Sequence, residues 1–201
     1  GALLTDDEAP GKAVPASDPL YGQRASVGIV RVSRDVFRQS SIGAIFADRE
    51  LNGGYNRVGG VDGRFKLNGN WLASGQMVAS ATVLPDGTRM AGPAYKARLR
   101  RDGRQFYYDL DFNDRSPGFV TQTGFLAEGT VERPIRGGRD ILRPSFRPDM
   151  RSVGQFASYR FRPEGKHLIS WGPNIFVNPI WDHQGNRLDL YTDYSLSVEL
   201  I

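Results

Sequence analysis

The amino-acid sequence predicts an all-β fold, built as an antiparallel up-and-down (meander) sheet. From Tyr21 onward, apolar and polar residues alternate with a period of two, which is typical of strands with one apolar face. Glycine, with 24 residues, and proline, with 12, both exceed their average usage and favour a chain that turns often. The hydrophobic fraction of 39% is that of a folded chain rather than a disordered one.

Residues 1–20 precede this pattern and predict a linker or extended segment, which leaves residues 21–201 for the sheet. They hold three prolines and the acidic cluster Asp6-Asp7-Glu8 but show little periodicity. The cluster lacks the alternate-position ligands and the glycine of a calcium loop, so we expect solvated side chains there. Because the chain stops within an alternating pattern at Ile201, we expect it to be part of a longer protein.

About nine or ten strands follow from the alternation and the turn sequences. In chain order, they are expected at residues 25–37 and 41–48, in the hairpins 61–84 and 93–113, and at residues 153–161, 166–171, 174–182 and 187–200. Residues 129–149 are the least regular region. We expect the strand 174–182 to pair with the last one through Gln184-Gly185, with Trp181 beside Leu188.

The registers of the two hairpins follow from their turn sequences and from the requirement that apolar residues of paired strands lie on the same face of the sheet. In the first, a three-residue loop at 68–70 places Phe65 opposite Ala73, with Gly69 or Asn70 in the left-handed conformation. In the second, Asp102-Gly103 is typical of a two-residue turn and places Leu99 opposite Phe106. The apolar face of the second hairpin then holds Tyr95, Ala97, Leu99, Phe106, Tyr108 and Leu110, and the polar face holds Lys96, Arg98, Asp109 and Asp111.

The length of the last strand favours a membrane β-barrel. Its alternation runs from Arg187 to Leu200, whereas strands of globular proteins average about five or six residues. A strand that crosses a bilayer at a tilt needs about nine to eleven residues. The sequence therefore predicts that the sheet is part of an outer-membrane-type β-barrel, with its apolar face toward lipid and its polar face toward the lumen.

Catalytic and metal chemistry find little support. There is no cysteine, there are only two histidines, His167 and His183, and no nucleophile elbow, phosphate-binding glycine loop or zinc-protease motif occurs. Asp109 and Asp111 could form a carboxylate pair for glycoside hydrolysis, but a polar face opposite Lys96 and Arg98 explains them better. We expect no enzyme activity, no metal and no cofactor, and we expect both histidines to be surface residues.

Arginine supplies 22 of the 26 basic residues. Arg98, Arg100, Arg101 and Arg104 cluster near Tyr107, but acidic residues alternate with them, so the face is mixed in sign and we expect no nucleic-acid partner. Eight arginines and three acids fall between Glu132 and Arg162. This stretch fits either a positively charged loop folded into a pore or a solvated surface loop.

Several short motifs resemble a bacterial family. They are Gly1–Lys12 (GALLTDDEAPGK), Ser41–Phe46 (SIGAIF) with Asp48-Arg49-Glu50, Tyr55–Val58 (YNRV) with Val61–Arg64 (VDGR), and Ser116–Phe119 (SPGF) with Gly124-Phe125. Together they resemble the C-terminal region of proteins that join a carbohydrate-binding family 9-like domain to a domain of unknown function numbered 5916. The resemblance is densest over residues 1–125. It implies an outer-membrane β-barrel preceded by a sugar-binding domain, and it supplies no catalytic residue.

The leading functional hypothesis is a barrel segment in the outer membrane of a Gram-negative bacterium that binds or passes a solute, such as a carbohydrate. Its expected partners are outer-membrane lipid, that solute and the remainder of the parent chain. The alternative is a soluble β-sandwich or small barrel that binds a glycan or another ligand, with Trp71, Trp171 or Trp181 as a stacking platform. A β-rich hydrolase that uses Asp109 is a remote third option.

Overall fold

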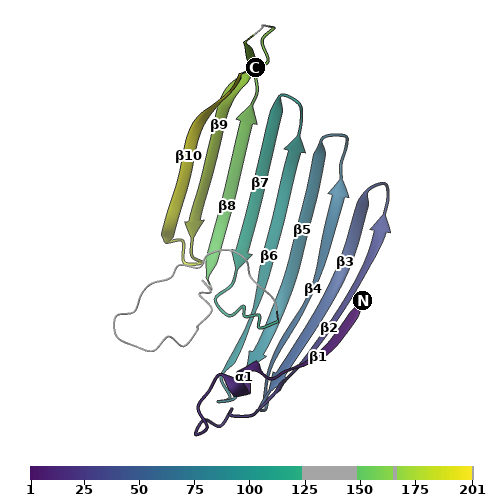
Figure 1. Ribbon diagram of the computed structural model, residues 1–201, viewed down its shortest axis with the longest axis vertical. Coiled ribbons are helices and arrows are strands. Elements are labelled where there is room, and N and C mark those ends of the chain that lie inside the picture. Colours follow the sequence, from purple (N-terminus) through teal and green to yellow (C-terminus); the bar gives the residue numbers. More distant parts are fainter. Residues whose placement is uncertain (124–148, 165–166, 201) are drawn as a thin grey trace.

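The computed structural model describes residues 1–123, 149–164 and 167–200. It contains one ten-stranded antiparallel sheet in which every strand pairs with the next along the chain (Figure 1). The strands are β1 (Ala2–Asp7), β2 (Ala25–Val36), β3 (Ser40–Leu51), β4 (Gly54–Lys66), β5 (Trp71–Val83), β6 (Arg89–Asp102), β7 (Phe106–Arg115), β8 (Met150–Tyr159), β9 (Leu168–Trp181) and β10 (Arg187–Leu200). The predicted all-β meander is confirmed.

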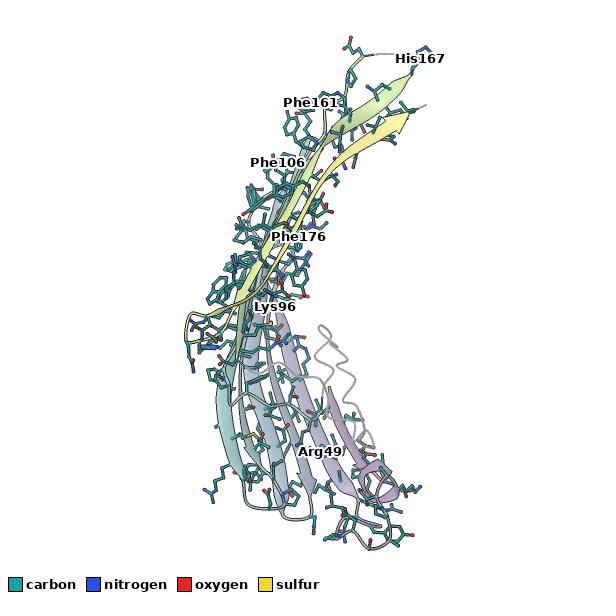
Figure 2. The ribbon with its side chains drawn as sticks, turned by 90° about the vertical axis from the view of Figure 1, so that its left-hand side faces the viewer. Arg49, Lys96, Phe106, Phe161, His167 and Phe176 are labelled. Carbon is teal, nitrogen blue, oxygen red and sulfur yellow. The ribbon has the colours of Figure 1, made fainter. Side chains whose placement is uncertain are left out.

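The sheet is curved and open. Figure 2 shows Phe106 and Phe161 on its convex side, and Lys96 and Phe176 on its concave side. Within the described residues β1 and β10 are the two edges and do not pair with each other, so the sheet is not closed into a barrel. The register places the side chains of each strand alternately on these two faces.

This sheet has almost no hydrophobic core. Among the described residues the largest fully buried side chains are the polar Asn56 and Thr82, while Leu196 and Tyr194 are 63% and 70% exposed. The chain has 14281 Å² of accessible surface, against about 9,400 Å² for a folded monomer of its mass. Backbone hydrogen bonds between neighbouring strands, rather than apolar packing between layers, therefore hold the described fold together.

The register of the β4–β5 hairpin is confirmed. Phe65 lies opposite Ala73, and the amide of Leu67 donates to the carbonyl of Trp71 at 3.0 Å. The predicted left-handed residue in the loop is wrong, because neither Gly69 nor Asn70 has a positive φ. Instead, Asn68 Oδ1 accepts the amides of Asn70 and Trp71 at 2.9 and 3.0 Å and turns the chain with its side chain.

The predicted register of the β6–β7 hairpin is wrong, although its faces are right. Leu99 lies opposite Leu110 rather than Phe106, because Asp102-Gly103 does not form the two-residue turn and Gly103 has no positive φ. The observed register places Arg98 opposite Asp111 and Arg100 opposite Asp109, so cations face carboxylates across the strands. The pairing shifts by an even number of residues and therefore leaves every side chain on its expected face.

The end of the sheet differs from the prediction in two respects. The separate strands expected at 166–171 and 174–182 form the single strand β9. The β9–β10 register agrees from Asp189, which lies opposite Ile180, to Glu199. An irregularity at Leu188 places Arg187 rather than Leu188 opposite Trp181, and a second one follows Glu199.

The first 20 residues are not only a linker. They form β1, which pairs with β2, and the short helix α1 (Ala9–Lys12), whose Gly11 carbonyl accepts the amide of Gly22 at 3.1 Å. Residues 129–148 of the least regular region lie outside the described residues.

The β9–β10 turn offers a test by titration. The side-chain amide of Asn186, helped by the backbone amides of Asn186 and Gln184, lowers the pKa of the Asp182 carboxyl. Carbon NMR titration should give Asp182 a midpoint below the ordinary value of about 3.9. Its stabilisation of the turn should be complete at neutral pH and lost as the pH falls through that lowered value. In Asn186→Ala the midpoint should return toward the ordinary value; a wild-type midpoint at or above it contradicts the turn geometry.

Candidate functional site

The concave face gathers the polar side chains of neighbouring strands. Lys96, Arg98, Asp109 and Asp111, the four predicted lumen-facing residues, all lie on it and line one open groove. The six residues predicted to face lipid lie on the opposite, convex face. The structure thus brings the predicted polar set together, and the groove is the candidate site.

The groove lies over β6 to β9 and has a volume of about 870 Å³. Its charges are paired internally: Arg98 forms a two-point ion pair with Asp109, and Lys96 Nζ lies 3.7 Å from Asp111 Oδ2. The hydroxyl of Tyr107 donates to Asp109 Oδ2 at 3.0 Å. These bonds hold the carboxylates of Asp109 and Asp111 in defined positions in the groove.

Three aromatic rings also line the groove, and their grouping was not predicted from the sequence. Tyr107 and Phe156 meet edge to face with their centroids 5.7 Å apart, and Phe156 lies directly opposite Phe176 in the β8–β9 pair. Each ring occupies a position that alternation assigns to the polar face. An aromatic residue out of phase with its strand was the available signal, but only the register could bring the three together.

Residues 116–122 run across the concave face, a feature that sequence reasoning missed. This inward segment is tied to three strands by the buried side chain of Asn56 and its neighbours. Asn56 Nδ2 donates to Thr82 Oγ1 at 2.7 Å and to the Val120 carbonyl at 2.9 Å, and Asn56 Oδ1 accepts the Gln122 amide at 3.0 Å. Further along, Arg49 donates to Gln122 Oε1 at 2.9 Å.

Two glycines let the inward segment approach the sheet. A Cβ atom on Gly92 of β6 would lie 2.1 Å from Ser116 Oγ, and one on Gly118 would lie 2.2 Å from the Ala91 carbonyl oxygen. Both distances are far below van der Waals contact. The side chain of Phe119, 2% exposed, is buried where this segment meets the sheet.

The convex face carries an apolar belt between two distinct rims. At one end of the strands an aromatic rim comprises Phe65, Trp71, Phe106, Tyr108, Tyr159, Phe161 and Trp171. Within it, Phe161 stacks on Trp171 with centroids 4.6 Å apart, and Tyr159 packs on Phe161 at 4.7 Å.

At the other end of the strands is a charged rim. Arg57 lies 3.3 Å from Asp48 and 3.0 Å from Glu50, and Arg151 donates to Asp114 at 2.7 Å. His183 belongs here: its Nδ1 lies 2.6 Å from Asp149 Oδ1 and its Nε2 lies 2.9 Å from Asp114 Oδ1. The predicted surface histidine is thus fixed between two carboxylates.

The residues of the alternative hypothesis do not converge. Trp71 and Trp171 lie on the aromatic rim in strands separated by β6, β7 and β8, and Trp181 lies at the opposite end of β9. The described residues contain no group of His, Asp and Glu side chains that could hold a metal ion. No helix in the described ranges is long and apolar enough to span a membrane. Most of the arginine-rich stretch, residues 132–148, lies outside the described residues.

Comparison with protein-family models, curated proteins and solved structures finds no match to this chain. The class that can be stated is therefore the one the geometry defines: an open antiparallel meander with one polar and one apolar face. The resemblance to the domain 5916 family stays a prediction.

Asn56→Leu should release the inward segment. The substitution removes three hydrogen bonds and leaves the Val120 carbonyl and the Gln122 amide without their partner. Since an unsatisfied buried polar group costs about 1–3 kcal/mol, we expect the Gln122 amide to exchange hydrogen about five- to 150-fold faster.

Asn70→Leu is the matched control, because Asn70 lies in the exposed β4–β5 loop and only its backbone is hydrogen-bonded. It should leave exchange at Gln122 unchanged. Equal protection of Gln122 in Asn56→Leu and wild type would show that the segment is held by other contacts.

Proposed function

We propose that this chain is part of an outer-membrane β-barrel of a Gram-negative bacterium that binds or passes a small solute through its lumen. The convex face meets lipid and the concave face meets water. No catalytic role is proposed.

The observation that carries this proposal is the constant height of the apolar belt. The aromatic rim and the charged rim are eight residues apart on three different strands, from Phe65 to Arg57, from Phe106 to Asp114, and from Tyr159 to Arg151. Eight residues of antiparallel strand span about 27 Å along the strand, which is about 19–22 Å along the bilayer normal when the strands tilt by about 35–45°. Barrels of outer membranes have an apolar band about 25 Å tall with aromatic girdles at both interfaces. This sheet has an aromatic rim at one end of the belt and a charged rim at the other.

The residues within the belt suit lipid contact. Between the rims, β7 presents Leu110 and Phe112, and β4 presents Gly59, Val61 and Gly63. Gln155 is the polar exception on β8, and it accepts the Tyr108 hydroxyl at 3.3 Å. An unpaired polar group is costly in hydrocarbon, so a lipid-facing Gln155 needs a hydrogen bond of this kind.

The open edges indicate what the barrel still needs. Within the described residues no strand pairs with the outer side of β1 or of β10. An open sheet edge is not tolerated where it faces lipid. Further strands of the parent chain would pair with both edges and close the cylinder. The inward segment would then lie within the lumen and narrow it at the end near the charged rim.

Leu196→Arg should impair membrane insertion. Leu196 lies on the convex face of β10, where an arginine near the middle of the bilayer costs roughly 2 to 4 kcal/mol. Leu190→Arg should act in the same direction. The yield of the full-length protein in the outer-membrane fraction measures the effect.

Asp193→Arg is the control on the same strand, because Asp193 lies on the polar face opposite Phe176. It should assemble at close to the wild-type level. If Leu196→Arg assembled normally while Asp193→Arg did not, the assignment of the two faces would be reversed.

Partitioning separates this function from the soluble alternative. The full-length protein should require detergent for extraction and should stay with the membrane after washing at high salt and high pH. A monomer that is stable in buffer without detergent would favour a soluble ligand-binding sheet.

A further inference from the structure

The groove contains aromatic side chains, which a lumen filled only with water would not need. Tyr107, Phe156 and Phe176 place apolar ring surface on the face that otherwise carries charged, amide and hydroxyl groups. Aromatic surface in contact with water is unfavourable, and grouped rings beside ordered polar groups are characteristic of ligand sites. The volume of about 870 Å³ lies within the range of small-molecule sites.

The rings form a continuous patch over three neighbouring strands. Tyr107 is on β7, Phe156 is on β8 and Phe176 is on β9. Phe156 and Phe176 are direct cross-strand neighbours, and Asp109 is the partner of Phe156 on its other side. A flat ligand lying on the patch would therefore have a carboxylate at its edge.

Planar polar groups surround the patch. The paired guanidinium and carboxylate of Arg98 and Asp109 border Tyr107, and Asn178 lies along β9 from Phe176. At the other end, the Arg160 guanidinium donates to Ser158 Oγ at 2.9 Å and to Asn174 Oδ1 at 3.0 Å. Donors and acceptors alternate around the rings, which suits a ligand whose hydroxyl groups both donate and accept.

The charge balance argues against a strongly charged ligand. Two of the three cations that line the groove, Lys96 and Arg98, are paired with Asp111 and Asp109. A polyanion such as a nucleic acid needs an excess of cations free to contact phosphates. The groove therefore fits an uncharged ligand with many hydroxyl groups.

The floor of the groove is lowered at Gly154. A Cβ atom built there would be 3.6 Å from Asn178 Oδ1 and 3.7 Å from the Asp111 carbonyl oxygen, which are ordinary contacts. Alanine therefore fits at this position, whereas a bulky side chain would rise into the groove. A substitution at Gly154 thus fills the site without replacing any of its polar side chains.

We infer that the groove binds a neutral oligosaccharide. The apolar faces of the sugar rings lie on Phe156 and Phe176, and the sugar hydroxyls exchange hydrogen bonds with Asp109, Arg98 and Asn178. This inference rests on the proposed function, since it requires that the concave face be the one open to water.

The test is calorimetric titration of the full-length protein in detergent micelles with maltohexaose, cellohexaose and xylohexaose, each separately. At least one of them should bind. Phe176→Leu should weaken that binding by about two- to tenfold, the range expected for the loss of one aromatic contact. Phe176→Tyr, which keeps the ring, should retain it. Gly154→Trp should abolish binding and Gly154→Ala should preserve it.

The matched control is Phe112→Leu, the same substitution on the convex face, which should leave the affinity unchanged. The inference is overturned if none of the three sugars binds, or if Phe176→Leu and Gly154→Trp bind as wild type while folded by circular dichroism. Membrane partitioning of the wild-type protein is scored separately. A membrane-embedded protein that binds no sugar overturns the inference alone, and a protein soluble without detergent overturns the proposed function.

Discussion

The separation of the two faces of one sheet is the constraint on which the rest of the structure depends. Within the described residues, only the inward segment covers part of the sheet, so neither face is buried against a second layer. A shift of one residue in any strand pair would exchange its apolar and polar sets. The register of the strands therefore determines which side chains lie together, as core packing does in a globular domain. The surroundings of each face must in turn suit the side chains on that face.

The polar face is held in order by arginines that reach across strands. Arg31 of β2 donates to Asp62 Oδ1 of β4 at 2.8 Å, and this bond passes over β3 at Gly43. A Cβ atom on Gly43 would lie 2.9 Å from Asp62 Oδ2 and 3.1 Å from the Arg31 guanidinium. The long, planar guanidinium suits such bridging. This geometry gives arginine at position 31 a structural reason, and it gives Gly43 a role beyond close packing of the strands.

Alternation predicted most of the fold because it acts locally. It identified the faces of β6 and β7 even where the turn was misassigned, since the observed shift is by an even number of residues. It could not predict the partner of Leu99, because residues 103–105 form a longer connection than the expected two-residue turn. It also missed β1, which pairs through its backbone despite side chains with little periodicity.

The inward segment and the aromatic groove were beyond sequence reasoning for a different reason. Asn56, Thr82 and Gln122 are far apart in the chain, and each one alone is an ordinary polar residue of a strand or loop. Likewise, Phe176 joins Phe156 only through the β8–β9 register. Polar networks and ring clusters of this kind are set by tertiary pairing, so only the polar set that shares one hairpin could be named in advance.

These two features divide the concave face between them. The inward segment is anchored at Arg49, Asn56 and Ser80 on β3, β4 and β5, near the strand ends that carry the charged rim. The groove lies over β6 to β9 and stays open. In a closed barrel, a solute that enters the lumen would meet an obstructed wall on one side and the ring patch on the other. Under the proposed function, the inward segment would thus occupy one part of the lumen wall and leave the groove as the part that a solute can contact.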